Sequence, residues 1–513
     1  MSLAAATLGT AGTRQAVPMT RPVMARQSNT GNIDLALAEL DGIVTDAQER
    51  TGVPGIAVGV LHNDKLVVQK GFGVREAGLS SRVTADTVFQ LASVSKPFAS
   101  TVVAGLVGDG VVSWDSRLRD LFPTFEMYEP WVTREVTIRD MLAHRSGLPD
   151  HAGDLLEDIG YDRSEVLHRL RYQQPASSMR SAYAYTNFGF TAGAEAAAMA
   201  AGMSWEDVSA ERLYNRLGLH DTSSRFQDFI DSDRRAAGHV REDGAWVARY
   251  VRDPDPQSPA GGVSSSIRDV MTWLRLQLGN GTIDGEEIIS AAALVETHRP
   301  HMVSNPPQDP AADFAGFYGL GWNVTYDKSG LVRFGHSGAF ALGAATAVSV
   351  VPAYQLAIGV LTNGIPIGVP EAIMASFLDL VQTGAVQNDY VEIFGELFAE
   401  VLAPPYESDY DSPPSSPAPA LDAGAYTDVY ANDLYGEIEI TGGNGDLTLH
   451  LGPNRQAHSI DHYDRDVFLY QPTGENAGGP SAITFSVGAD GVASSVALQI
   501  LNVEGQGVFH RIV

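Results

Sequence analysis

The sequence predicts an α/β (α+β) protein in which helices flank an antiparallel sheet, an all-helical lobe lies beside it, and a small all-β barrel domain follows. Three observations support this. Strand patterns occur at both ends of the first 390 residues with helical periodicity between them, a proline-rich segment follows, and short alternating segments fill the rest of the chain. This order fits one domain whose sheet is completed by both halves of the chain.

The expected elements follow in chain order. Residues 1–30 mix Ala, Gly, Thr and Pro and are interpreted as a flexible tail or a signal remnant. Apolar spacing predicts helices over residues 33–49, 93–106, 163–172, 189–201, 266–278 and 371–381. Strands are expected over residues 55–60, 65–70, 88–91, 318–326, 331–334, 344–351 and 355–361, the first two joined by the turn-favouring pair Asn63-Asp64.

The C-terminal part is expected to form its own domain. Six prolines between Pro404 and Ala420 favour an extended linker, so residues 31–390 are assigned to a first domain, 391–420 to a helix end and linker, and 421–513 to the all-β domain. Alternating segments at residues 434–440, 447–451, 467–471, 482–487 and 496–501 are typical of a small barrel or sandwich.

Composition excludes several classes of function. The net charge of −28, without a Lys/Arg cluster, argues against nucleic acid as a partner. Pro352 interrupts the nearest candidate for a membrane span, residues 339–361. The absence of cysteine excludes disulfides, thiolate metal sites and a cysteine nucleophile, and no metal or cofactor is expected. Export to the periplasm or the extracellular space is favoured over the cytoplasm, and a homo-oligomer is one option for the assembly.

A serine and a lysine three residues apart form the first candidate catalytic motif. Ser93-Val94-Ser95-Lys96 follows an expected strand and opens an expected helix. Residues three apart share a helix face, so both side chains can meet. A partly desolvated lysine loses proton affinity and can accept the serine proton. The alternative is a surface Ser and Lys near a helix start, but none of the other three lysines has a serine three residues earlier.

Tyr185-Thr186-Asn187 is the second candidate motif. A tyrosine beside a cationic lysine can act as a general base and return the proton to the leaving group, and the Asn187 amide can bind a substrate amide. The alternative is a packing tyrosine with a helix-capping asparagine. Tyr430-Ala431-Asn432 has the same spacing in the C-terminal domain, so only chain order selects Tyr185.

His336-Ser337-Gly338 is the third motif and lies between two expected strands. Gly338 would let a substrate approach the strand edge closely. The alternative is a turn histidine without a function. His151-Ala152-Gly153 repeats the spacing but precedes no strand, which favours the later copy.

Taken in order, these motifs resemble the serine β-lactamase and penicillin-binding-protein superfamily, with His-x-Gly in place of Lys-Thr-Gly. The tyrosine form is similar to the class C β-lactamase branch, which also contains D-amino-acid peptidases and β-lactamase-like esterases. The resemblance covers residues 35–385 and includes further similar stretches at residues 89–98, 137–149, 260–269 and 318–322.

The resemblance implies a role for each motif residue. Ser93 is the expected nucleophile, Lys96 and Tyr185 are the proton-handling pair, and Asn187 positions the substrate. The backbone N–H groups of Ser93 and Ala339 are expected to form the oxyanion hole. The β-lactamase-like domain is then followed by a segment that resembles the lipocalin-like barrels of some peptidase-type members.

The predicted activity is acyl transfer through a Ser93 acyl-enzyme, on small peptides that carry a D-residue. Alternatives are a carboxylesterase, a β-lactamase, or a penicillin-binding sensor that does not deacylate. His336 replaces a lysine that would hold a substrate carboxylate. A histidine with an ordinary pKa would be neutral above pH 7 and gain charge toward pH 6, so affinity for carboxylates should improve toward pH 6.

Overall fold

The computed structural model describes residues 30–512 except 308, 310–313, 328–329, 404–405, 407–409, 411 and 444. The expected tail or signal remnant therefore lies outside the described residues, apart from Thr30, where the first helix begins. None of the helices in the described part of the chain combines the length and the apolar composition needed to cross a bilayer.

An eight-stranded antiparallel sheet forms the centre of the first domain. Its strand order is β2-β1-β14-β13-β12-β11-β10-β9, so the first hairpin pairs with strands from the end of the domain, as the sequence predicts. Asn63 and Asp64 have φ values of 50° and 62°, which the tight β1–β2 turn requires. The strands are β1 (Gly55–His62), β2 (Lys65–Gly73), β9 (Met302–Asn305), β10 (Gly316–Tyr318), β11 (Asn323–Tyr326), β12 (Val332–Phe340), β13 (Ala344–Val351) and β14 (Leu356–Thr362).

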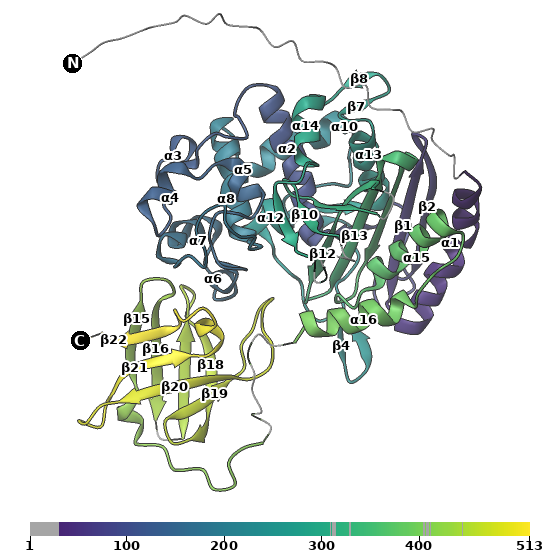
Figure 1. Ribbon diagram of the computed structural model, residues 1–513. Helices are drawn as coiled ribbons and strands as arrows, with labels where there is room; N and C mark the ends of the chain where they lie inside the picture. Colours follow the sequence, from purple (N-terminus) through teal and green to yellow (C-terminus); the bar gives the residue numbers. More distant parts are fainter. Residues whose placement is uncertain are drawn as a thin grey trace, which may run out of the picture.

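Helices cover both faces of this sheet (Figure 1). On one face, α1 (Thr30–Thr51) and α15 (Val369–Thr383) bury their apolar side chains against β1 and β14, and α16 (Tyr390–Val401) packs beside α15. On the other face, α13 (Ile267–Leu278) packs on β1 and β14. Helix α2 (Ser95–Gly108), whose first turn contains Lys96, lies between α14 (Ala291–Thr297) and the helical lobe.

The helical lobe is an insertion between β3 and the last strands of the sheet (Figure 1). Its central helix, α8 (Asn187–Ala200), packs against α5, α2 and α12. The remaining helices are α3 (Leu118–Leu121), α4 (Pro130–Glu135), α5 (Ile138–Leu142), α6 (Asp154–Asp158), α7 (Arg163–Arg169), α9 (Trp205–Ser209), α10 (Asn215–Leu217), α11 (Phe226–Asp231) and α12 (Ser258–Gly261). Short two-stranded sheets join β3 (Val88–Gln90) to β6 (Ser264–Ser266), β4 (Val240–Glu242) to β5 (Ala245–Val247), and β7 (Thr282–Ile283) to β8 (Glu286–Glu287).

The C-terminal domain is a closed eight-stranded barrel, in which β15 pairs with both β16 and β22. Alternate side chains point inward and fill the barrel with residues such as Tyr430, Ile440 and Phe485. The strands are β15 (Asp428–Asn432), β16 (Gly436–Gly443), β17 (Asp446–Leu451), β18 (Gln456–Asp464), β19 (Val467–Tyr470), β20 (Ser481–Val487), β21 (Ala493–Leu498) and β22 (Val508–Arg511).

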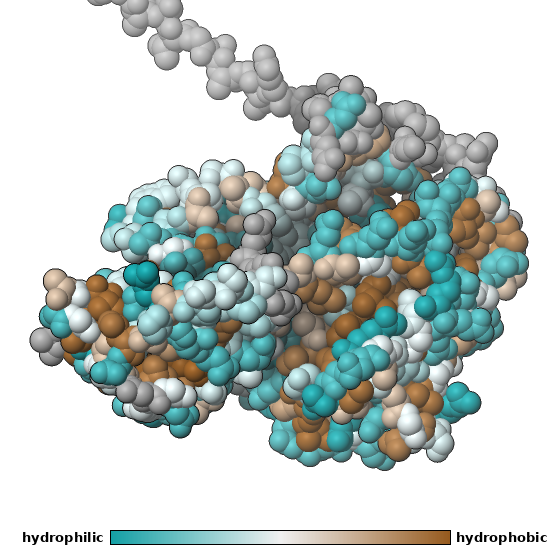
Figure 2. Space-filling view, turned by 90° about the horizontal axis from the view of Figure 1, so that it is seen from below, coloured by the Kyte–Doolittle hydropathy of each residue, from teal (hydrophilic) through white to brown (hydrophobic). Residues whose placement is uncertain are grey.

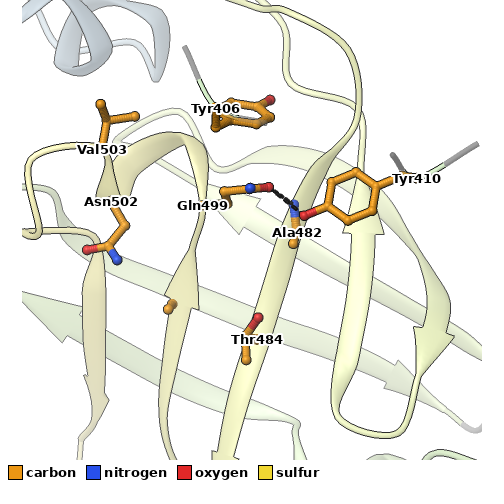
Figure 3. A pocket seen from close by; sticks show the side chains of 8 residues that line it. Tyr406, Tyr410, Ala482, Thr484, Gln499, Asn502 and Val503 are labelled. Carbon is orange, nitrogen blue, oxygen red and sulfur yellow. Dashed lines mark hydrogen bonds between the residues drawn. The ribbon is translucent and has the colours of Figure 1, made fainter. Parts of the chain in front are cut away.

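Two tyrosines of the proline-rich segment pack against the barrel rather than standing free of it. Tyr406 and Tyr410 line a cavity of about 450 Å³ over β20 and β21 (Figure 3), and the Tyr410 hydroxyl donates to Gln499 Oε1 at 2.7 Å. The described part of the linker is therefore tied to the barrel.

Seen from below, hydrophobic residues alternate with strips of hydrophilic ones on the surface of the first domain (Figure 2).

The structure corrects several expected boundaries. The expected strand 318–326 is two strands, β10 and β11, separated by a turn in which Gly321 has a φ of 79°. The His336 motif lies within β12 rather than between strands. Helix α16 runs from Tyr390 to Val401, in the stretch that the sequence assigns to a helix end and linker. Strands β15, β18 and β22 were not expected, and β18 is mostly polar.

Candidate functional site

Ser93 lies in a single 3-10 turn, Ala92–Val94, between β3 and α2. The turn is fixed from below because Leu91 N–H donates to Val263 O and Val263 N–H donates to Ser95 Oγ. Ala92 has a φ of 46°, a strained conformation for a residue with a Cβ, of the kind that occurs at functional sites. The side chain of Ser93 is thereby held at the surface of a buried turn.

Lys96 is fully buried and its ammonium lies next to Ser93. Its Nζ donates to Ser93 Oγ at 3.1 Å, to Asn187 Oδ1 at 2.7 Å and to Ala260 O at 3.1 Å. Burial lowers the pKa of Lys96 to about 7, against the opposing charge of Asp154. A substantial fraction of the neutral amine is therefore present near pH 7, in contact with the serine hydroxyl.

Tyr185 and Asn187 approach Lys96 from the start of α8. Lys96 Nζ lies 4.5 Å from the centre of the Tyr185 ring, and Asn187 joins Lys96 to Asp154 by donating from Nδ2 to Asp154 Oδ2 at 2.8 Å. Burial raises the pKa of Tyr185 well above 10, although a hydrogen bond with Ser93 lowers it. Because the pKa of Lys96 is about 7 and that of Tyr185 is well above 10, Tyr185 is still protonated at a pH where the Lys96 amine is already neutral.

The third motif lies on β12, against the serine turn. A Cβ on Gly338 would lie 2.2 Å from Leu91 O and 2.9 Å from Ser93 N, so only glycine permits this approach. Strand β11 pairs with β12 only as far as Gly335. Beyond it, no described strand covers this edge of β12, and Ala339 is exposed between the buried Gly338 and Phe340.

His336 is a buried, neutral hydrogen-bonding group. Its Nδ1–H donates to Ser337 O at 2.6 Å, and its Nε2 accepts from the Tyr318 hydroxyl at 2.9 Å. Burial and the nearby Lys96 lower the pKa of His336 to about 3. The expectation that His336 gains charge toward pH 6 is therefore wrong, because burial and the nearby positive charge disfavour the protonated ring.

The structure thus brings Ser93, Lys96, Tyr185, Asn187 and β12 together, and it adds residues that the sequence did not single out. Asp154 supports Asn187, and the same carboxylate oxygen lies 2.8 Å from His151 Nδ1. His151 belongs to the discarded His-x-Gly copy, yet its backbone N–H donates to Tyr185 O at 2.7 Å. The sequence signal for this pair was the spacing of His151 and Asp154, an aspartate three residues after a histidine.

His144 holds the loop that carries Tyr185. Its Nδ1 accepts from Thr186 N–H at 3.1 Å, its carbonyl accepts from Ala184 N–H, and its ring lies 4.5 Å from the Tyr185 ring. Residues 137–149, one of the stretches that resemble the family, therefore support the loop that carries Tyr185. Tyr430, the tyrosine of the second Tyr-x-Asn copy, is in the barrel, where its hydroxyl donates to Tyr426 O.

In the described ranges, no cluster of three or more His, Asp or Glu side chains is placed to hold a metal ion.

Comparison with known protein families agrees with this arrangement. The Beta-lactamase family model matches residues 40–382, and the chain belongs to this family of hydrolases and penicillin-binding proteins. The model of a domain of unknown function, DUF3471, matches residues 412–509 and covers the barrel. The barrel is closed and eight-stranded, and its relationship to lipocalins stays a prediction.

Two curated relatives extend the comparison. Penicillin-binding protein 4 of Amycolatopsis lactamdurans is 30% identical over 61% of this chain and 81% of its own length. The unguisins hydrolase ungD of Aspergillus violaceofuscus is 24% identical over 79% of this chain and 77% of its own length, so its match extends beyond the first domain.

Solved structures show the same fold. The octameric penicillin-binding protein homologue of Pyrococcus abyssi is 16% identical, covers 92% of this chain and 99% of its own, and has a TM-score of 0.58. A class C beta-lactamase of Rhodobacter sphaeroides is 22% identical and covers 72% of this chain and 99% of its own, with a TM-score of 0.54.

Proposed function

We propose that the protein is a serine hydrolase that forms an acyl-enzyme on Ser93 and acts as a peptidase or amidase on small peptides containing a D-residue. The observation that carries this proposal is the buried Lys96 amine, 3.1 Å from Ser93 Oγ with a pKa near 7. A neutral amine in contact with a hydroxyl is the arrangement that a serine nucleophile needs.

In this mechanism, neutral Lys96 takes the Ser93 proton as Oγ attacks the substrate carbonyl. The N–H groups of Ser93 and Ala339 stabilise the negative charge that develops on the carbonyl oxygen. Protonated Tyr185 donates to the leaving nitrogen and is reprotonated through Lys96, so the acyl group stays on Ser93. Water then attacks the ester, with the same pair moving the proton in reverse.

The choice of a peptide over a penicillin rests on His336. Neutral His336 provides no cation for a substrate carboxylate, which disfavours the penicillin-type substrates that a β-lactamase must hold. Two relatives are named a penicillin-binding protein and a hydrolase of unguisins, and both names fit acyl transfer to a serine without separating an amide from an ester. A carboxylesterase is the second candidate, because the half-buried Ser93 and neutral surroundings suit a neutral ester equally.

The test is covalent labelling followed by turnover. A serine-reactive phosphonate should add its mass once to the parent protein, at Ser93, and not to Ser93→Ala. A D-alanyl peptide amide, a short-chain aryl ester and a cephalosporin are then compared at equal concentration. Labelling at another serine would refute the proposed nucleophile. A stable adduct formed with one of the three substrates, without turnover of any of them, would refute the hydrolase in favour of a sensor. Assembly as a homo-oligomer stays a prediction that mass measurement in solution would test.

A further inference from the structure

A loop of the barrel reaches the strand that carries the proposed oxyanion donor. Residues 471–480 connect β19 to β20, and within this loop the Glu475 side chain points into the first domain. Glu475 Oε1 accepts a hydrogen bond of 2.5 Å from Ala341 N–H, and its side chain is 14% exposed. Ala341 directly follows β12, two residues after Ala339.

The contact is anchored separately from the site. Asp158, at the end of α6, accepts three hydrogen bonds of 2.9 Å, from Glu475 N–H, Asn476 N–H and Asn476 Nδ2. Gly474 has a φ of 115°, and a Cβ there would lie 2.5 Å from Asp158 Cγ. The loop conformation is thus fixed by its own contacts with the lobe, and it presents Glu475 from a defined position.

The second oxygen of Glu475 faces a buried cation. Glu475 Oε2 lies 3.7 Å from Arg252 Nε, and Arg252 Nη2 lies 2.7 Å from Glu157 Oε2. The Arg252 guanidinium also lies over the Phe340 ring, 5.3 Å from its centre. The end of β12 is therefore held between a barrel carboxylate and an arginine of the first domain.

Strand geometry shows which edge Glu475 occupies. The Phe340 carbonyl accepts from Gly343 N–H at 2.9 Å in the β12–β13 turn, so the backbone groups of Phe340 face β13. Alternate residues of a strand direct their N–H and C=O groups to opposite edges. Ala339 consequently faces the uncovered edge, where an extended substrate would add as another strand, and the N–H of Ala341, the first residue of the turn after β12, donates to Glu475.

We propose that Glu475 closes the substrate cleft at Ala341, so that the acyl part of the substrate has room for two residues. The inference rests on the proposed function. In an antiparallel arrangement, the substrate residue that carries the attacked carbonyl pairs with Ala339, and the residue two positions before it would pair with Ala341. Glu475 already accepts from Ala341 N–H, so a third residue on the acyl side loses its partner and meets the carboxylate.

The experiment uses the full chain and D-alanyl peptide substrates with one, two or three residues on the acyl side, beside a matched series extended on the leaving-group side. In the parent, kcat/KM is expected to fall about tenfold or more from two to three acyl residues, the scale of losing a hydrogen-bond partner at Ala341 and meeting the Glu475 side chain. Glu475→Ala is expected to recover most of this loss while changing the one-residue substrate by less than about threefold.

Three further variants sharpen the test. Glu475→Gln keeps an oxygen for Ala341 N–H and should keep the restriction, whereas Asn476→Ala, which removes one bond to Asp158, should relax it in part. Glu504→Ala, at an exposed barrel glutamate, should match the parent. Equal kcat/KM for two and three acyl residues in the parent, an unchanged ratio in both Glu475→Ala and Asn476→Ala, or discrimination only on the leaving-group side would overturn the inference. If the phosphonate labels Ser93 in the parent, such a result refutes the cleft boundary alone, and absence of that labelling refutes the proposed function.

Discussion

Replacing Asp154 by Asn should shift the pH dependence of Ser93 reactivity to lower pH. The Asp154 carboxylate accepts from Asn187, which in turn accepts from Lys96, and its charge raises the pKa of Lys96 against the larger lowering by burial. Asparagine has the same shape, and its amide oxygen can take the place of Oδ2, the oxygen that contacts both Asn187 Nδ2 and His151 Nδ1. Removal of the charge should therefore favour the neutral amine further.

The size of the shift follows from the geometry. The path from Lys96 Nζ to the Asp154 carboxylate consists of the hydrogen bond to Asn187 Oδ1, the Asn187 amide and the hydrogen bond from Asn187 Nδ2, and it spans roughly 7 Å. At an effective dielectric constant of about 20, a unit charge at that distance contributes about 2 kcal/mol. This corresponds to between one and two pKa units, so a reactivity limb near 7 should move to roughly 5.5. Because Lys96 reacts as the neutral amine, the rate rises with pH through its pKa in both proteins.

The assay is the second-order rate constant for labelling by an uncharged phosphonate between pH 5 and 9, which isolates the nucleophile from later steps. Asp34→Asn, at an exposed position on α1, is the matched control and should leave the limb unchanged. A limb that stays at its original pH in Asp154→Asn, or moves upward, would show that Lys96 is not the group that titrates. Thermal unfolding of both variants checks that the lobe is intact.

Three other outcomes are expected. Lys96→Ala should reduce kcat by about 1,000-fold and Tyr185→Phe by about 10- to 100-fold, since losing a positioned acid or base costs on this order, whereas Tyr430→Phe in the barrel should match the parent; equal losses from all three would contradict the assignment. In the parent, KM for a D-alanyl peptide with a free carboxylate should be the same at pH 6 and 8 because His336 stays neutral, and His336→Lys should lower it; improvement toward pH 6 in the parent would show that His336 titrates. A chain ending at Ala403 should still fold and label at Ser93, with its thermal midpoint lowered by several degrees through the loss of barrel contacts, and failure to unfold cooperatively would show that the two domains share one core.

The fold was predictable where local patterns carry it. The hairpin β1–β2 follows from two short strand segments, the first of them apolar throughout, joined by Asn63-Asp64, and the long helices follow from apolar spacing. Strand β18 was missed because its sequence is largely polar and only Ile460 is buried. Strands β15 and β22 were missed because they become strands by pairing with each other, as the first and last strands that close the barrel, rather than through their local sequence. Long-range pairing of this kind leaves little local signal.

The candidate site was predictable only in part for a related reason. Ser93 and Lys96 are neighbours in sequence, and the motif order placed Tyr185, Asn187 and β12 beside them. The pKa of His336 was mispredicted because it depends on burial that no local pattern shows and on the charge of Lys96, which is distant in sequence. Contacts between domains, such as Glu475 with Ala341, are further still from any local signal.

Helix α6 explains why the barrel and the site are connected. In five residues it carries Asp154, Glu157 and Asp158, and the spacing of three and four places these carboxylates near one another. Burying three acids together is unfavourable unless each has donors, and each finds them in a different place: Asp154 at Asn187, Glu157 at Arg252, Asp158 at the barrel loop. Removing the barrel leaves Asp158 without those donors and frees the end of β12, while Lys96 keeps its contacts with Ser93 and Asn187. Loss of the barrel should therefore alter which substrates are accepted more than it alters the reactivity of Ser93.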